Sequence, residues 1–210
     1  MGTEPSHTEV ETQLDSNDTR MQQVTYAAGM LWGALDTALT INDANQAAIA
    51  WFVVNPSNGQ DGSSAELANQ GYLGVPGNNL IYPAIGVTRS GKGVMAFTLV
   101  GQDHFPSAAY ATIDEVGVGD VHVAAEGAGP QDGFTSYKAI VGDPPRPRWG
   151  DYGAAVPVGN GVWIASEYIG QTCNLADFTS AATSPRFSCG RTRVVFGNWA
   201  TRIRLVRVGD

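Results

Sequence analysis

The feature that most constrains the fold of this chain is the regular return of short apolar runs between turn residues. Residues 146–168 show the pattern most clearly, with a strand of small and β-branched residues, a Gly159-Asn160-Gly161 turn, and a second strand of alternating character. Alternation with a period of two is typical of a strand with two different faces. The turn residues tolerate the positive φ of a tight hairpin, so the stretch predicts a β-hairpin.

The same grouping occurs three times along the chain. We expect four strands in each unit, and the units cover residues 22–78, 79–145 and 146–210. Gly91–Val94 matches Gly159–Val162 at an offset of 68 residues, which also aligns Tyr82–Ala84 with Gly150–Tyr152. The expected strands are residues 24–28, 30–35, 47–54 and 65–73, then 80–87, 94–100, 108–113 and 121–124, then 151–158, 162–169, 191–196 and 201–208.

Three such units predict an all-β, propeller-like fold. A four-stranded sheet cannot bury both of its faces alone, so repeated units of this kind stack face to face around an axis. Closed propellers usually have about four to eight blades. The chain is therefore predicted to be a partial β-propeller of about three four-stranded antiparallel blades. It would need the remaining blades of a parent chain, or a self-association partner, to close.

The ends of the chain differ in charge. Residues 1–21 are polar and acidic and are predicted to be disordered, without a signal-peptide pattern. Residues 1–145 carry 4 basic and 16 acidic groups, whereas residues 146–210 carry 8 basic and 4 acidic groups. The basic C-terminal third of the chain could bind an anionic ligand, or its charge could simply balance that of the acidic remainder. The net charge of −8 disfavours nucleic acid and anionic membranes as partners.

Few residues suggest metal or redox chemistry. Cys173 and Cys189 are disulfide candidates, and a bridge would stabilise the fold by roughly 3 kcal/mol in an oxidising compartment. The histidines, His7, His104 and His122, lack the spacing of metal ligands. No nucleotide-binding or calcium-binding motif occurs in the sequence. We expect neither a metal nor a cofactor.

Charged and aromatic residues around position 150 are the candidate ligand contacts. Arg148, Asp151 and Glu167 can form either a recognition fork or a structural ion pair. Tryptophans that recur with the units are expected to fill gaps between sheets, because each buries a large area. Trp149 follows two prolines and opens its strand, so it is the exception to test.

Five motifs of the sequence carry a resemblance to a known family. They are Arg148–Tyr152, Trp163–Tyr168, Asn198–Ile203, Tyr82–Ile85 and Phe105–Tyr110. These motifs resemble the final blades of sialidase-like β-propellers of secreted bacterial proteins. The resemblance spans residues 24–208 and implies a propeller and an extracellular or cell-envelope location for the parent protein, more than a reaction.

Two functions follow as expectations. The preferred one is a non-catalytic scaffold or binding module for a glycan or protein ligand, with Arg148, Trp149, Asp151 and Tyr152 as binding residues. The alternative is a sialidase-type exo-glycoside hydrolase, since true sialidases use a tyrosine nucleophile with a glutamate, three arginines and an aspartate acid. Its candidates would be Arg148, Asp151, Glu167, Tyr168, Arg191 and Arg202.

Two observations favour the binding module. The sialidase aspartate box, Ser-x-Asp-x-Gly-x-Thr-Trp, does not occur in the sequence. Glu167 and Tyr168 are adjacent, so on one strand they would point to opposite faces.

Overall fold

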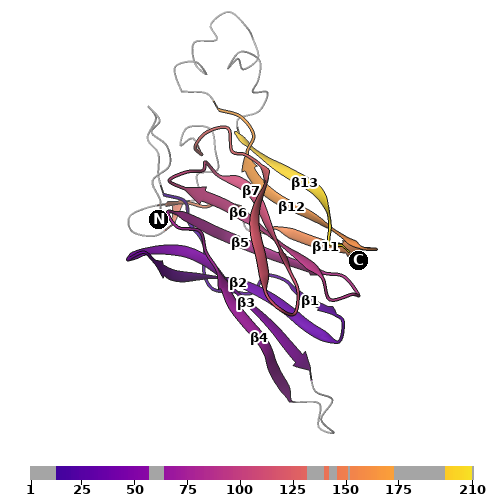
Figure 1. The fold of residues 1–210 in the computed structure, drawn as a ribbon. Coiled ribbons are helices and arrows are strands. Elements are labelled where there is room, and N and C mark those ends of the chain that lie inside the picture. Colours follow the sequence, from indigo (N-terminus) through magenta and orange to yellow (C-terminus); the bar gives the residue numbers. More distant parts are fainter. Residues whose placement is uncertain are drawn as a thin grey trace, which may run out of the picture.

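The computed structural model describes residues 13–56, 64–131, 140–141, 146–150, 152–172 and 197–209, and in these the fold is all-β. Three antiparallel sheets stack side by side, together with one short strand pair (Figure 1). This confirms the predicted all-β, propeller-like class, and the described residues form a partial stack rather than a closed ring. The strands are β1 Val24–Ala27, β2 Met30–Ile41, β3 Ala44–Pro56, β4 Ala65–Leu73, β5 Asn78–Val87, β6 Gly93–Gly101, β7 Ser107–Ile113, β8 Val118–Ala125, β9 Ile140–Val141, β10 Arg146–Pro147, β11 Ala154–Val158, β12 Gly161–Ile169 and β13 Trp199–Arg207.

The first sheet has the order β1-β2-β3-β4, and two-residue turns make its first two hairpins. Ala28 and Gly29 have φ values of +52° and +79°, and Asn42 and Asp43 have values of +49° and +63°. Positive φ at both central residues is typical of a turn whose twist matches that of the strands. All four strands expected from the sequence are therefore present.

One of these turn positions allows a stability prediction. Ala28 adopts a left-handed conformation, which costs a residue with a Cβ about 1 kcal/mol or more. We therefore expect Ala28→Gly to raise the free energy of unfolding by about 1 kcal/mol in urea titrations. The control is Ala27→Gly in strand β1, which should lower it. Equal effects of the two substitutions would contradict the prediction.

The middle sheet, β5-β6-β7-β8, is covered on both faces. Every residue of β5 and β6 is buried, which explains why these strands show an almost continuous apolar run. On one side Phe97 and Ile85 pack against Trp32 and Trp51 of the first sheet. On the other side Val94 and neighbouring residues pack against β12 of the third sheet. The middle sheet thus supplies both main core layers.

The third sheet has the described order β11-β12-β13. Strand β12 pairs with β13 over its whole length, from Gly161 opposite Arg207 to Ile169 opposite Trp199. The strand expected at residues 191–196 and both candidate disulfide cysteines, Cys173 and Cys189, lie outside the described residues. The expected strands at 151–158, 162–169 and 201–208 correspond to β11, β12 and β13.

The offset of 68 residues between the second and third units holds only in part. Strands β6 and β12 begin at Gly93 and Gly161, in agreement with that offset. The preceding strands end at Val87 and Val158, an offset of 71, because residues 88–92 connect β5 to β6 whereas only Gly159 and Asn160 connect β11 to β12. The predicted alignment of Tyr82–Ala84 with Gly150–Tyr152 is therefore wrong by three residues.

The first strands of the three sheets converge. The side-chain hydroxyl of Thr25 in β1 donates a hydrogen bond to the Ile85 carbonyl of β5, at 2.7 Å. Gln23, just before β1, donates through Nε2 to the Ala155 carbonyl of β11, at 2.8 Å. The first and third sheets flank the middle one, yet these contacts bring β1, β5 and β11 together. The sheets are arranged like blades around an axis.

The segment before β1 also contributes to the core. Residues 1–21 were expected to be disordered, and residues 13–21 are described. Leu14 is buried beside Trp149 and Ile169, and Asp15 forms a parallel β-bridge with Arg148. One apolar side chain in this polar segment therefore packs on the end of the stack.

Candidate functional site

Trp149 and Tyr152, two of the residues predicted to bind a ligand, lie beside a bulge in strand β5. The ladder between β5 and β6 is irregular between Ile81 and Ala84, where Pro83 has no N–H to donate. Tyr82 has a φ of +59°. This backbone conformation is unfavourable for a bulky residue and persists mostly where surrounding contacts hold it in place. Its backbone N–H donates to Asp36 Oδ1 at 2.9 Å, and its hydroxyl donates to the Asp15 carbonyl at 3.0 Å.

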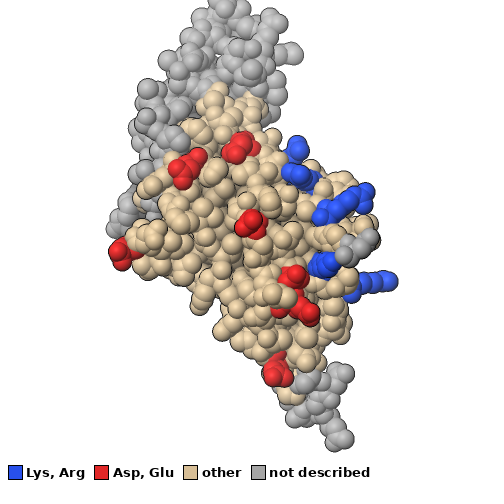
Figure 2. All heavy atoms as spheres, in the orientation of Figure 1, with Lys and Arg blue, Asp and Glu red and all other residues tan. Residues whose placement is uncertain are grey.

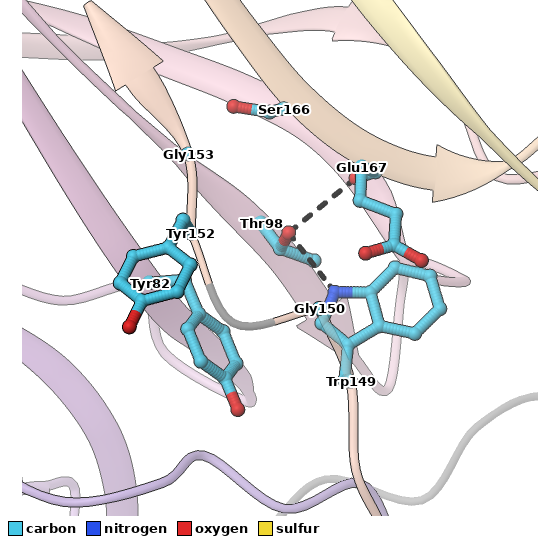
Figure 3. A pocket seen from close by; sticks show the side chains of 8 residues that line it. All are labelled: Tyr82, Thr98, Trp149, Gly150, Tyr152, Gly153, Ser166 and Glu167. Atoms are coloured by element: carbon cyan, nitrogen blue, oxygen red, sulfur yellow. Dashed lines mark hydrogen bonds between the residues drawn. The ribbon is translucent and has the colours of Figure 1, made fainter. Parts of the chain in front are cut away.

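Trp149, the expected exception among the tryptophans, is a core residue. Its side chain is 2% exposed, and Nε1 donates to the Thr98 hydroxyl at 3.1 Å (Figure 3). The indole ring packs in a cluster that joins the segment before β1 to the middle and third sheets. The other buried members are Leu14, Ile81, Tyr82, Val100 and Ile169.

Glu167 reaches toward the indole of Trp149 (Figure 3). Gly150 has a φ of +50°, and a Cβ at this position would lie 2.8 Å from Glu167 Oε2. The backbone conformation favours glycine here, and a larger residue would displace the Glu167 carboxylate. The Thr98 hydroxyl also donates to the Glu167 carbonyl, at 3.4 Å.

The cavity between these residues is small. It encloses about 10 Å³ and is lined by Tyr82, Thr98, Trp149, Gly150, Tyr152, Gly153, Ser166 and Glu167. This volume fits about one water molecule but not a sugar ring. Tyr152 is 74% exposed at the rim. The described side chains around Trp149 therefore leave too little space for a sugar ligand.

The residues proposed for a sialidase-type reaction are partly brought together. Arg148 precedes Trp149 in the sequence, and Glu167 lies beside Trp149 in space. Tyr168 follows Glu167 on an uninterrupted strand and so faces the other side of the sheet. Arg202 is exposed on β13, opposite Ser166. Asp151 and Arg191 lie outside the described residues.

A second, larger cavity lies on the other side of Asp36. It encloses about 450 Å³, and most of the residues that line it, from the segment before β1 and from β2 and β3, are polar. Burial raises the pKa of Asp36 to about 7, with a smaller contribution from the charge of Asp18, and the Tyr82 N–H partly opposes the rise. The lining residues are Ser16, Asn17, Asp18, Thr19, Asp36, Thr37, Ala38, Asn45, Gln46 and Ala47.

Sequence reasoning missed Asp36 and the role of Tyr82. The available signals were that Asp36 is the sole charged residue in the apolar run 30–41 and that Pro83 interrupts another apolar run. A charge within a buried strand requires a partner, and here the partner comes from a residue 46 positions away. Pairing over such a distance cannot be deduced from either run alone.

The outer face of the third sheet is a third candidate site, because it is apolar and uncovered in the described residues. Trp163 lies between Val156 of β11 and Leu205 of β13 in one cross-strand row, and Ile203 occupies the next row. We call this surface the third-sheet face. Its exposed members are Val156 (54%), Val158 (57%), Trp163 (44%), Trp199 (51%) and Ile203 (64%).

The first sheet has a similar outer surface. Tyr26, Leu31, Val54 and Leu67 form one row across its four strands. Tyr72 lies on the same side, in the row with Leu35 and Ala50. We call this surface the first-sheet face. Its exposed members are Val24 (53%), Tyr26 (67%), Leu67 (49%) and Tyr72 (65%).

Other kinds of site were sought in the same part of the chain. Among the described residues, no three His, Cys, Asp or Glu side chains gather into a possible metal site. The described residues also include no helix with the length and apolar character needed to span a membrane. No family model, curated protein or solved structure matches the chain.

Proposed function

We propose that the chain is a non-catalytic scaffold that binds a protein ligand through the third-sheet face. The observation that carries the proposal is the row of exposed Val156 and Trp163 with half-buried Leu205, flanked by exposed Ile203. Contiguous apolar patches of this kind are uncommon on the surfaces of monomeric proteins and mark interaction sites. An extracellular or cell-envelope setting belongs to the same proposal and comes from the resemblance alone.

The geometry around Trp149 supports a binding role over hydrolysis. A glycosidase must admit a sugar ring between its catalytic groups, whereas the cavity there encloses about 10 Å³. Glu167 and Tyr168 point to opposite faces of β12, so they cannot act on the same substrate atom.

A glycan ligand is the second candidate, and the Asp36 cavity favours it. A volume of about 450 Å³ lies within the range of small-ligand pockets. Its hydroxyl, amide and carboxyl groups could exchange hydrogen bonds with a polyhydroxylated ligand. The third-sheet face is the stronger observation, because its large apolar side chains have no other role in the described fold.

An enzymatic assay separates the scaffold from the hydrolase. We expect no release of fluorophore from a fluorogenic sialoside above the rate in buffer, because the cavity that the described residues form beside Glu167 encloses only about 10 Å³. The control variant is Arg148→Lys, which keeps the charge but loses the planar fork. Hydrolysis by the wild-type protein that disappears in this variant, with an unchanged urea midpoint, would overturn the proposal.

A dye-binding assay tests the surface itself. Bis-ANS fluorescence should increase with the wild-type chain, measured at dilutions at which light scattering shows a single chain. We expect Ile203→Arg to reduce the increase, because it places a charge in the third-sheet face. The matched control is Val116→Arg, since Val116 is 84% exposed but lies in the turn before β8. Equal fluorescence from all three proteins would contradict a binding role for this face.

A further inference from the structure

We propose that the ligand of the third-sheet face is the first-sheet face of a second copy of this chain, so that two chains close into one ring of six sheets. The proposal rests on the proposed function, because it names the partner of the same surface. Each surface has exposed aromatic and aliphatic side chains, and in the first-sheet face the Met21 side chain packs on Gly33.

The stacking already present inside one chain supports this order. The first sheet packs on one face of the middle sheet, and the third sheet packs on the other, with β1, β5 and β11 converging. Placing the first sheet of a second chain on the third sheet of the first chain repeats this face-to-face packing of one sheet on the next. Rings of about four to eight blades close, and two chains with three sheets each supply six.

Charge favours head-to-tail docking over contact between two third-sheet faces. Residues 1–77 contain 1 basic and 9 acidic residues, whereas residues 146–210 contain 8 and 4. Figure 2 shows the basic side chains gathered on the side where β13 lies and acidic ones over the rest of this view. Of the three exposed arginines of β13, Arg207 lies on the side of Ile203, whereas Arg204 lies over the Tyr110 ring of the middle sheet. Opposite potentials steer association, and like charges oppose it.

A two-fold ring of this kind has two identical interfaces, each made of unlike surfaces. A heterologous contact gives a closed assembly when its rotation closes the ring, and an open filament when it does not. Because β1, β5 and β11 converge, each sheet is rotated relative to the previous one about a common axis, and this rotation can close the ring. The expected particle therefore contains two chains and does not grow further.

The first measurement is the mass in solution of the whole chain, by light scattering over a concentration series. We expect a species of twice the chain mass of 22.1 kDa. Ile203→Arg in the third-sheet face and Tyr72→Glu in the first-sheet face should each raise the dissociation constant roughly 100-fold, since each buries an unpaired charge. Val116→Arg, outside both faces, should remain dimeric. Circular dichroism and urea midpoints show whether each variant is folded.

Mixing the two variants tests the order of docking. A heterodimer of Ile203→Arg with Tyr72→Glu has one unaltered interface, and its other interface pairs the two new charges, so mixing should restore the dimer. If mixing does not restore it, the docking is not head-to-tail and the proposal is overturned.

A wild-type chain that stays monomeric also overturns the second copy as partner. In that case, dye binding that is sensitive to Ile203→Arg leaves the proposed function standing with a different protein as ligand. A monomer without such dye binding refutes both.

Discussion

Replacing Trp149 by alanine is expected to lower the free energy of unfolding by about 3–5 kcal/mol, the range for a large buried aromatic residue. The indole is 2% exposed and contacts the segment before β1 as well as residues of two sheets, so its loss leaves a cavity where three parts of the fold meet. A domain of this size is stable by only about 5–15 kcal/mol. Urea denaturation followed by circular dichroism measures the change.

Two further variants identify the cause of that loss. Trp149→Phe keeps most of the side-chain volume but removes the N–H that donates to the Thr98 hydroxyl. The lost hydrogen bond should lower the free energy of unfolding by about 1–2 kcal/mol, in addition to the effect of the smaller contact area. Tyr152→Ala is the control, because this nearby aromatic side chain is 74% exposed, and its effect should stay within about 0.5 kcal/mol. Equal losses for Trp149→Ala and Tyr152→Ala would show that Trp149 is not a structural centre.

The strands could be predicted from the sequence because their signals are local. Alternation in β12 and the turn residues Asn42, Asp43 and Gly159 depend only on near neighbours, and the structure has strands and turns at these places. The register of β11 could not be predicted, because it depends on how many residues the connecting turn uses. Gly159 and Asn160 suffice here, and five residues are used between β5 and β6.

Burial of the tryptophans was harder to predict than the strands that carry them. Trp163 has the spacing of a residue between sheets but is 44% exposed, and Trp149 opens its segment but is buried. The difference depends on what covers each face: Leu14, from the segment before β1, packs beside Trp149, and no described residue covers the third-sheet face. The wrong tryptophan was therefore expected to be exposed.

Asp36→Asn is expected to stabilise the protein at neutral and higher pH. Burial raises the pKa of Asp36 from 3.8 to about 7, so the folded state holds a proton that the unfolded chain releases between these values. The free energy of unfolding therefore falls as the pH rises from about 4 to 7, by up to about 4 kcal/mol for this group. Asparagine removes the ionisation and keeps an oxygen that accepts the Tyr82 N–H.

The measurement is the difference in free energy of unfolding between the variant and the wild type across this pH range. We expect a difference near zero at about pH 4 that grows in favour of Asp36→Asn through neutral pH and levels off above it. Asp43→Asn is the matched control, because Asp43 is exposed in the turn at the end of the same hairpin and asparagine accepts its φ of +63°. It reports the effect of the same substitution at an exposed position. A less stable Asp36→Asn at pH 8 would mean that the carboxylate has a cationic or hydrogen-bonding partner that outweighs its burial.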